Sequence, residues 1–371
     1  MIELGKKSAS NFMRLIDHPL SVLPGLSPVL ARSALARSAL ARSAQVSESL
    51  NHRLENLYEL IAFEQSVSSK PPEHLAFYCA VAHQSLTNAF ILTQRNAALR
   101  RIESSLNPIA QHLMADHASG EKWISVGISH LTTSRQHLAS PAVTARAHSS
   151  GWTLRGSVPW VTAASGSQAL VVAACDSENF SQQFLFYLPM DLESVQCGPN
   201  MDLLALKDSC TCEVHLHGVE LSAREILHGP CENVLSLSQS GGAGGLQTTA
   251  LALGLTACAI DRIYGHAESR SSLHRFQAAF SKQWSVLFER MLQAAIPGKS
   301  DIDLAKLRKD ANDLALRVTQ AALAIEKGAG FLENSDVSRW AREALFFLVW
   351  SCPQPIADAH LCDFTQFDPE L

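Results

Sequence analysis

The sequence predicts an α+β protein of several domains: an N-terminal helical domain, a central antiparallel β domain and a C-terminal four-helix bundle. Three observations predict this order. Apolar residues recur at helical spacing from residue 51 to about 118, and short runs rich in β-branched and aromatic residues follow from Trp123 to about Leu227. Long helical patterns return after Gly241. With 371 residues, 47% of them hydrophobic, the chain can bury a sizeable core.

These changes of pattern divide the chain into four segments. A small β domain between two helical segments is an uncommon order, so the boundaries carry information about the fold class. We expect a poorly ordered or atypical extension at residues 1–50, an N-terminal helical domain at 51–120, a middle β domain at 121–228 and a helical bundle at 240–365.

The expected extension contains a five-residue repeat, Ala-Arg-Ser-Ala-Leu, which starts at Ala31 and again at Ala36. Five residues advance a helix by about 500°, so the arginines spiral around it and leave no single apolar face. A weakly helical or poorly ordered segment is therefore expected. The alternative is a transit peptide, because basic residues outnumber acidic ones here.

The first helical segment reads as three helices. Leu54, Leu57 and Ile61 share one helical face, and Pro71 or Pro72 opens a second helix that continues to Thr93. A third is expected from Asn96 to Met114.

The strands of the β domain are separated by turn residues such as Ser-Ser-Gly and Asp-Ser. Their β-branched and aromatic residues are typical of short strands. The expected strands are Trp123–Ile128, Ala142–His148, Gly151–Leu154, Ala169–Ala174, Gln183–Leu188 and Thr211–Leu216.

Glycine and proline mark the ends of the C-terminal helices. Beyond Pro353 and Pro355 we expect a tail in which Asp358 and His360 form a surface pair. The four expected helices are Leu246–Tyr264, Gln277–Ala294, Asp303–Lys327 and Arg339–Val349.

Net charge and the spacing of the cysteines argue against several classes of function. The net charge of −5 gives no electrostatic footprint for nucleic acid. The nine cysteines form no Cys-x-x-Cys pair, so we expect no metal site and reduced thiols in a cytoplasmic protein. Cys210 and Cys212 are expected to share one face of a strand. No apolar run reaches the 18–20 residues or so of a membrane span, and the N-terminus lacks a signal-peptide pattern.

Residues 151–162 read Gly-Trp-Thr-Leu-Arg-Gly-Ser-Val-Pro-Trp-Val-Thr, with an aromatic side chain and a hydroxyl two residues apart. The segment resembles the Leu-x-Gly-x-Lys-x-Trp-Val-Thr segment of the acyl-CoA dehydrogenase family. The resemblance implies that Trp160 and Thr162 lie against the flavin ring of FAD. An aromatic packs well on a flat ring, and a hydroxyl satisfies a ring heteroatom. Taken alone, Trp160 is also typical of an ordinary strand core.

Residues 127–134, Gly-Ile-Ser-His-Leu-Thr-Thr-Ser, occupy the place of the family's flavin- and pyrophosphate-binding loop. The resemblance implies that Ser129 faces the flavin and that Thr132, Thr133 or Ser134 contacts a phosphate. The family's Glu-Pro and Gly-Ser-Asp are missing, and a polar β turn is the alternative. Residues 201–211 resemble the segment that closes the family's β domain, with a plain strand as the alternative.

Two C-terminal segments extend the resemblance over about residues 70–365. Residues 253–270 are similar to a family helix whose final arginine, here Arg270, reaches the FAD of a neighbouring subunit. Residues 327–344 are similar to the glycine turn that approaches the adenine half, which implies roles for Gly328 and Gly330. A homodimer or homotetramer follows from such a shared site. The alternatives are an arginine that complements a helix dipole and a generic C-terminal glycine turn.

The family's dehydrogenases need a carboxylate base to remove the α-proton of the acyl group. The two family positions for this base hold Ser351 and Gly244, and neither is a carboxylate. The nearby Glu343 corresponds to a structural Asp of the family.

The resemblance implies an FAD-dependent oxidoreductase that acts on the CH–CH bond of an acyl-CoA or a related small molecule, with the electron acceptor left open. The missing base keeps two alternatives. One is a flavin-dependent monooxygenase of the same superfamily, which does not need the glutamate. The other is a catalytically inactive homologue that serves in binding or assembly.

Overall fold

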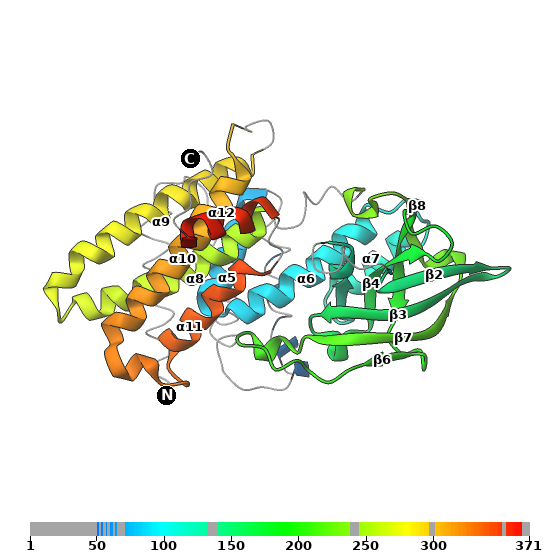
Figure 1. The fold of residues 1–371 in the computed structure, drawn as a ribbon, viewed down its shortest axis with the longest axis horizontal. Helices are drawn as coiled ribbons and strands as arrows, with labels where there is room; N and C mark the ends of the chain where they lie inside the picture. Colours follow the sequence, from blue (N-terminus) through cyan, green and yellow to red (C-terminus); the bar gives the residue numbers. More distant parts are fainter. Residues whose placement is uncertain are drawn as a thin grey trace.

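A computed structural model describes residues 71–132, 140–237, 245–296, 301–350 and 354–365, together with eight positions between 50 and 64. The repeat at residues 31–44 lies outside the described residues. Helices occupy one half of the molecule and a sheet the other, and the long helix α6 (Leu86–Glu103) runs from one half into the other (Figure 1).

The N-terminal helical segment differs from the prediction in where its helices begin and end. α5 spans Pro71–Gln84, α6 follows at once, and α7 spans Ala110–Ala118. The predicted continuous helix to Thr93 is wrong because Ser85 is extended (φ −155°) and its side chain accepts a hydrogen bond from the Asn88 backbone N–H. Ser85 thus caps a new helix, as serine commonly does.

The β domain is one mixed sheet in the order β6-β7-β3-β2-β4-β5-β8, with β1 beside β4. All pairings are antiparallel except β1–β4 and β2–β4, which are parallel. Strands β6 and β8 were not expected from the sequence. The strands are β1 (Ile124–Gly127), β2 (Val143–His148), β3 (Gly151–Val161), β4 (Ala169–Asp176), β5 (Gln183–Pro189), β6 (Val195–Cys197), β7 (Cys212–Leu221) and β8 (Ile226–Cys231).

Both faces of the sheet bury apolar side chains. On one face, Leu154, Val172 and Phe186 belong to a core made by the strands themselves. On the other face, strands β1, β4 and β5 pack against α6 and α7, where Ile102 and Leu113 contribute. This alternation follows from the two-residue period of a strand.

The described part of the C-terminal region contains the four expected helices and one more. α8 spans Leu246–Ala267, α9 His274–Ala294, α10 Leu304–Glu326 and α11 Asp336–Leu345. α5 packs on α8 at Gly254, where a Cβ atom would lie 2.4 Å from the Cys79 carbonyl oxygen. The glycine therefore permits a close approach of the two helices, and the helical segments from both ends of the described chain share one core.

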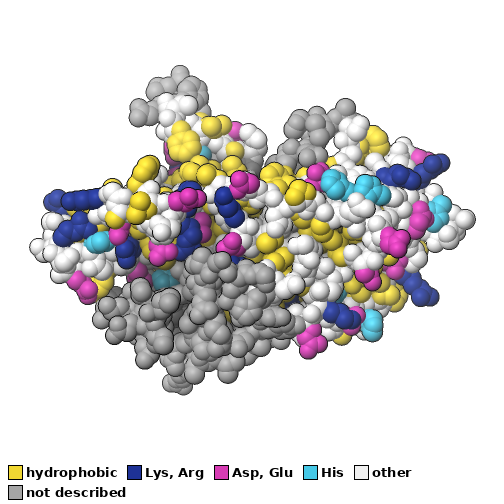
Figure 2. Space-filling view, turned by 90° about the horizontal axis from the view of Figure 1, so that it is seen from below, with side chains coloured by type: hydrophobic (Ala, Val, Ile, Leu, Met, Phe, Trp, Pro, Cys, Tyr) yellow, Lys and Arg dark blue, Asp and Glu magenta, His cyan; other side chains and the backbone are white. Residues whose placement is uncertain are grey.

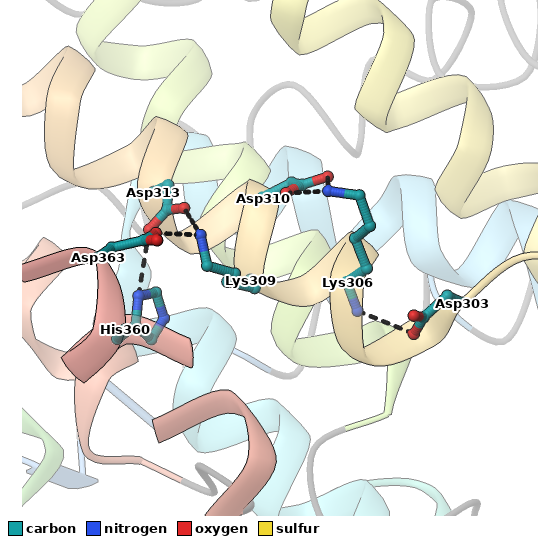
Figure 3. Close-up of polar contacts among 7 residues, drawn as sticks. All are labelled: Asp303, Lys306, Lys309, Asp310, Asp313, His360 and Asp363. Atoms are coloured by element: carbon teal, nitrogen blue, oxygen red, sulfur yellow. Dashed lines mark hydrogen bonds and ion pairs between the residues drawn. The ribbon is translucent and has the colours of Figure 1, made fainter. Parts of the chain in front are cut away.

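The expected C-terminal tail is wrong, because residues Gln354–Thr365 form a further helix, α12. His360 is buried and lies 3.1 Å from Asp313 of α10, so it does not pair with Asp358. Lys309 of α10 bonds to both Asp313 and Asp363 (Figure 3). These contacts hold α12 against α10.

The described surface carries no single-sign patch on the face drawn in Figure 2, where basic and acidic side chains are interspersed. None of the described helices has the length and apolar character needed to cross a membrane. Within the described residues, no cluster of three or more His, Cys, Asp or Glu side chains is arranged to hold a metal ion.

Candidate functional site

Strand β1 is held against the end of β3, and this contact organises the candidate site. A Cβ atom on Gly127 would lie 2.7 Å from Cγ1 of Val158, so only glycine allows the two strands to cross this closely. The Ser125 hydroxyl donates a 2.7 Å hydrogen bond to the Thr162 carbonyl oxygen. The segment after β1 and the segment after β3 therefore lie together.

Three buried hydroxyls form a chain beside this crossing. The Oγ of Ser209 lies 2.8 Å from Oγ1 of Thr211, which lies 3.3 Å from Oγ1 of Thr162. The Ala163 N–H also donates to the Ser209 carbonyl oxygen at 2.9 Å. Each hydroxyl has one donor and two acceptor positions, so a chain of three keeps hydrogen-bonding capacity at its ends. Ser209 and Thr211 lie in the segment that the sequence singled out as closing the β domain.

Trp160 is half-exposed, with 47% of its surface accessible, although Val161 beside it is fully buried. The alternative of an ordinary strand-core tryptophan is therefore wrong. A large flat apolar ring that is exposed two residues before the buried Thr162 presents a surface on which another flat ring can pack.

The short helix η2 (Ser129–Leu131) follows β1 and packs against β3. The Ser129 Oγ atom is buried and has no hydrogen-bond partner, which is costly unless a ligand or water supplies one. In contrast, the Thr132 hydroxyl donates a 2.7 Å hydrogen bond to the Ser129 carbonyl oxygen and so stabilises the turn. Thr133 and Ser134 lie outside the described residues.

Arg270, Gly328 and Gly330 lie together at the other end of the molecule. Both Nη atoms of Arg270 donate to the Ile325 carbonyl oxygen, at 3.2 and 3.1 Å, near the C-terminus of α10. This end of α8 and α10 is the part of the helical half farthest from the sheet (Figure 1). The structure therefore does not bring these residues to Trp160 within one chain.

Gly328 and Gly330 differ in whether the space around them requires a glycine. At Gly330 a Cβ atom would lie 2.7 Å from the Glu326 Cβ atom, so packing within the chain explains this glycine. At Gly328 nothing lies within 4 Å of an added Cβ atom. The positive φ of the turn falls on Lys327 (φ 59°, ψ −144°), not on either glycine.

Glu326 is a charged residue of this region that the sequence did not reveal. Its carboxylate accepts hydrogen bonds from Arg262 at 2.7 Å and contacts the His266 ring at 2.6 Å. The hydrogen bonds from Arg262 and then from His266 outweigh burial and lower the pKa of Glu326 to about 2. The three partners lie on α8 and α10, too far apart in sequence for a local pattern to show them.

Neither expected base position can be placed, because Ser351 and Gly244 lie outside the described residues. Glu343, in contrast, is only 2% exposed and lies 3.8 Å from an Nη atom of Arg339. Burial raises the pKa of Glu343 to about 7, against the opposing effect of Arg339. Asp358 bonds to Gln354 at the exposed start of α12.

Curated proteins similar in sequence to this chain are acyl-CoA dehydrogenases. No protein-family model matches the chain. The chain is 26% identical over 224 residues to the mitochondrial short-chain specific acyl-CoA dehydrogenase of Bos taurus, covering 55% of this chain and 53% of the relative. It is 24% identical over 212 residues to a probable acyl-CoA dehydrogenase of Bacillus subtilis, covering 52% and 55%. The matches therefore span about half the length of these curated relatives.

Solved structures agree over nearly the whole chain. Butyryl-CoA dehydrogenase from Megasphaera elsdenii superposes with a TM-score of 0.72 at 18% identity, covering 95% of this chain and 98% of that one. A KijD3 in complex with FMN gives 0.71 at 16% identity, with coverage of 94% and 95%. A glutaryl-CoA dehydrogenase from Mycobacterium smegmatis in complex with FADH2 gives 0.69 at 13%, with coverage of 94% and 90%. The chain has the acyl-CoA dehydrogenase fold and is a divergent relative of the acyl-CoA dehydrogenases.

Proposed function

We propose that this protein is a flavin-dependent oxidoreductase that binds FAD at the crossing of β1 and β3 and acts on the CH–CH bond of an acyl thioester. Two observations carry the proposal: Trp160 near the end of β3 is half-exposed, and the Oγ of Ser129 in η2, which packs against β3, is buried and unpartnered. An aromatic face and an unused hydroxyl fit a flat heteroaromatic ring with polar edges. Structures of the same fold in complex with FADH2 and with FMN support this choice of cofactor.

The residues of the crossing would divide the binding of FAD between them. Trp160 packs against the ring, while the hydroxyls of Ser129 and Thr162 hydrogen-bond to its edge. Thr132 keeps the turn of η2 in shape through its bond to the Ser129 carbonyl oxygen. When bound, the flavin supplies a two-electron acceptor for hydride, which no protein side chain can replace.

The second group of residues would serve a neighbouring subunit. Two of the five N–H groups of Arg270 are used within the chain, which leaves donors for a pyrophosphate. Gly328 has open space around its Cα atom, so a partner's cofactor can approach the backbone there. Gly330 is explained by packing inside the chain, so its part is to shape the turn. This division requires a homodimer or a homotetramer.

The residues at the two expected base positions bear on which reaction the flavin would carry out. Dehydrogenation needs a base for the α-proton, and serine at position 351 and glycine at 244 cannot supply one. This departure favours a second candidate, a flavin-dependent monooxygenase, whose reaction with oxygen does not require that carboxylate. A binding or assembly role without flavin is the third.

The experiment begins with the visible spectrum of the purified protein. A yellow protein that acyl-CoAs bleach without oxygen supports dehydrogenation. A flavin that is not bleached, with oxygen uptake when a flavin reductase is supplied, supports the monooxygenase. A colourless protein that takes up no added FAD contradicts both enzyme functions.

Two variants test the site itself. Trp160→Ala removes a ring contact worth about 1 kcal/mol, so we expect FAD to bind roughly fivefold more weakly. Ser129→Ala removes the unpartnered hydroxyl and is expected to weaken FAD binding without lowering stability. The matched control is Phe180→Ala, an equally exposed aromatic (48%) in the turn between β4 and β5. Equal FAD affinity in all variants would place the cofactor elsewhere.

A further inference from the structure

Strand β6 ends in a cysteine whose thiol meets a second cysteine on the neighbouring strand. Cys197 is opposite Val214 in the antiparallel register of β6 and β7, so Cys212 is its diagonal neighbour. Residues two apart on a strand point to the same face, so both thiols lie on the face that Val214 occupies. The two thiols affect the pKa of one another, and neither is in a disulfide.

We propose that Cys197 and Cys212 are a redox-active thiol pair, which a peroxide oxidises to a disulfide that joins the edge strand β6 to β7. The inference does not depend on the proposed flavin.

The oxidation proceeds in two displacement steps. The Cys197 thiolate attacks one oxygen of hydrogen peroxide, an S–O bond forms, the O–O bond breaks, and the departing hydroxide takes a proton to become water. The Cys212 sulfur then loses its proton and attacks the Cys197 sulfur. The S–S bond forms, the S–O bond breaks, and a second water leaves. Two thiols lose two electrons and two protons in total, and one peroxide is reduced to two waters.

The surroundings of the two thiols assign their roles. Cys197 is exposed and Cys212 is completely buried, so peroxide reaches Cys197 first. The hydrogen bond from Cys212 lowers the pKa of Cys197 to about 7, while the same contact and burial raise the pKa of Cys212. The exposed thiol is thus the better nucleophile at neutral pH, and the buried thiol is the resolving one.

The position of β6 allows the bond to close. A disulfide needs Cα atoms within about 7 Å, and diagonal neighbours across an antiparallel pair lie about 7–8 Å apart. β6 has three residues and lies at the end of the sheet, where β7 is its one partner among the described strands. A short edge strand can make this small approach without disturbing the rest of the sheet.

Another nearby cysteine is not placed to compete. The sequence predicts that Cys210 and Cys212 share a strand face, but β7 begins at Cys212 and Cys210 has a left-handed backbone (φ 46°) before it. The Cys210 thiol contacts Asn200, and burial raises its pKa. It therefore reacts more slowly than Cys197.

Formation of the disulfide would also affect the candidate site. Cys212 is opposite Val161 in the register of β3 and β7, and it directly follows Thr211. Thr211 is in turn hydrogen-bonded to Thr162. Oxidation of the pair therefore constrains the start of the strand that carries the hydroxyl chain.

The test treats the full-length protein with one equivalent of hydrogen peroxide and maps its disulfides by peptide mass spectrometry. We expect a Cys197–Cys212 peptide pair that reductant releases. Cys197→Ser abolishes it, and Cys210→Ser, the matched control, leaves it unchanged. A bond from Cys197 to another cysteine, or a Cys197 that advances to sulfinic acid while Cys212 stays reduced, overturns the proposal.

A second measurement does not need the disulfide to form. The rate of Cys197 alkylation by iodoacetamide is measured against pH, with half of its maximum expected near pH 7 in the native protein. Cys212→Ala removes the hydrogen bond, and we expect this midpoint to rise by one unit or more. An unchanged midpoint in a folded variant overturns the pairing of the two thiols.

Discussion

The buried carboxyl of Glu343 gives the protein a pH dependence that one substitution removes. Burial raises the pKa of this group from 4.5 to about 7 in the folded state. In the unfolded chain the pKa returns to its ordinary value, so the folded protein binds this proton more tightly. The stability contributed by the group is fully present below pH 4.5 and is lost as the pH rises through 7.

The size of the effect follows from the two pKa values. Their difference corresponds to roughly 3 kcal/mol of unfolding free energy, taking about 1.4 kcal/mol for each pKa unit. Glu343→Gln keeps the size of the side chain and stays neutral at every pH. We expect the variant to be more stable than the native protein by up to about 3 kcal/mol at pH 8, and equally stable at pH 4. The lost attraction to Arg339, which is 37% exposed, is a smaller effect.

The assay is urea unfolding followed by tryptophan fluorescence, for both proteins, at a series of pH values from 4 to about 8. The difference between the two free energies isolates position 343 from all other titrating groups. Glu232→Gln is the matched control, because Glu232 is exposed and its replacement is expected to change stability by less than about 0.5 kcal/mol. A difference that does not vary with pH, or a variant that is less stable at pH 8, would refute the reasoning.

Four further substitutions test other contacts. Gly330→Ala forces a Cβ atom to 2.7 Å from that of Glu326 and should lower the unfolding free energy by about 1–3 kcal/mol. Gly328→Ala, where the added Cβ atom meets nothing, should lower it by less than about 0.5 kcal/mol. Urea unfolding of the two variants measures both values. Lys309→Met removes the ion pair with Asp363, so the amide hydrogens of α12 should exchange faster than in the native protein, while those of α8 should not. If α12 exchanges at the same rate in both proteins, apolar contacts alone hold it. The lowered pKa of Glu326 means that its stabilisation is present above pH 4.5 and is lost as the pH falls through 2, so Glu326→Gln should be less stable at pH 7 and the difference should vanish in acid.

The order of helices, strands and helices could be predicted because each segment is long enough for its apolar period to be visible. The helix α12 was missed because Pro353 and Pro355 were interpreted as the end of helical structure. Pro355 is instead the second residue of α12, in the first turn, where proline loses no intrahelical hydrogen bond. The break at Ser85 was missed for the converse reason, since apolar residues continue across it.

The sequence could not predict the features of the candidate site that depend on contacts between residues far apart in the chain. The exposure of Trp160 depends on what the sheet leaves uncovered, because its local pattern is that of any strand. The pairing of Cys197 with Cys212 depends on the register of β6, a strand of three residues with no periodic pattern. The burial of Glu343 depends on the packing of α11 as a whole.

The packing of α5 on α8 determines when the helical half can fold during translation. Cys79 meets Gly254 across this contact, so about 175 residues separate two surfaces that bury one another. At 5–20 residues per second, a ribosome leaves the apolar face of α5 without its partner for roughly 10–35 s. The sheet between them can form in that interval, but the helical half can close only after α8 has emerged. Chaperones that cover apolar helices during translation are therefore expected to raise the yield of this protein more than those that act after release.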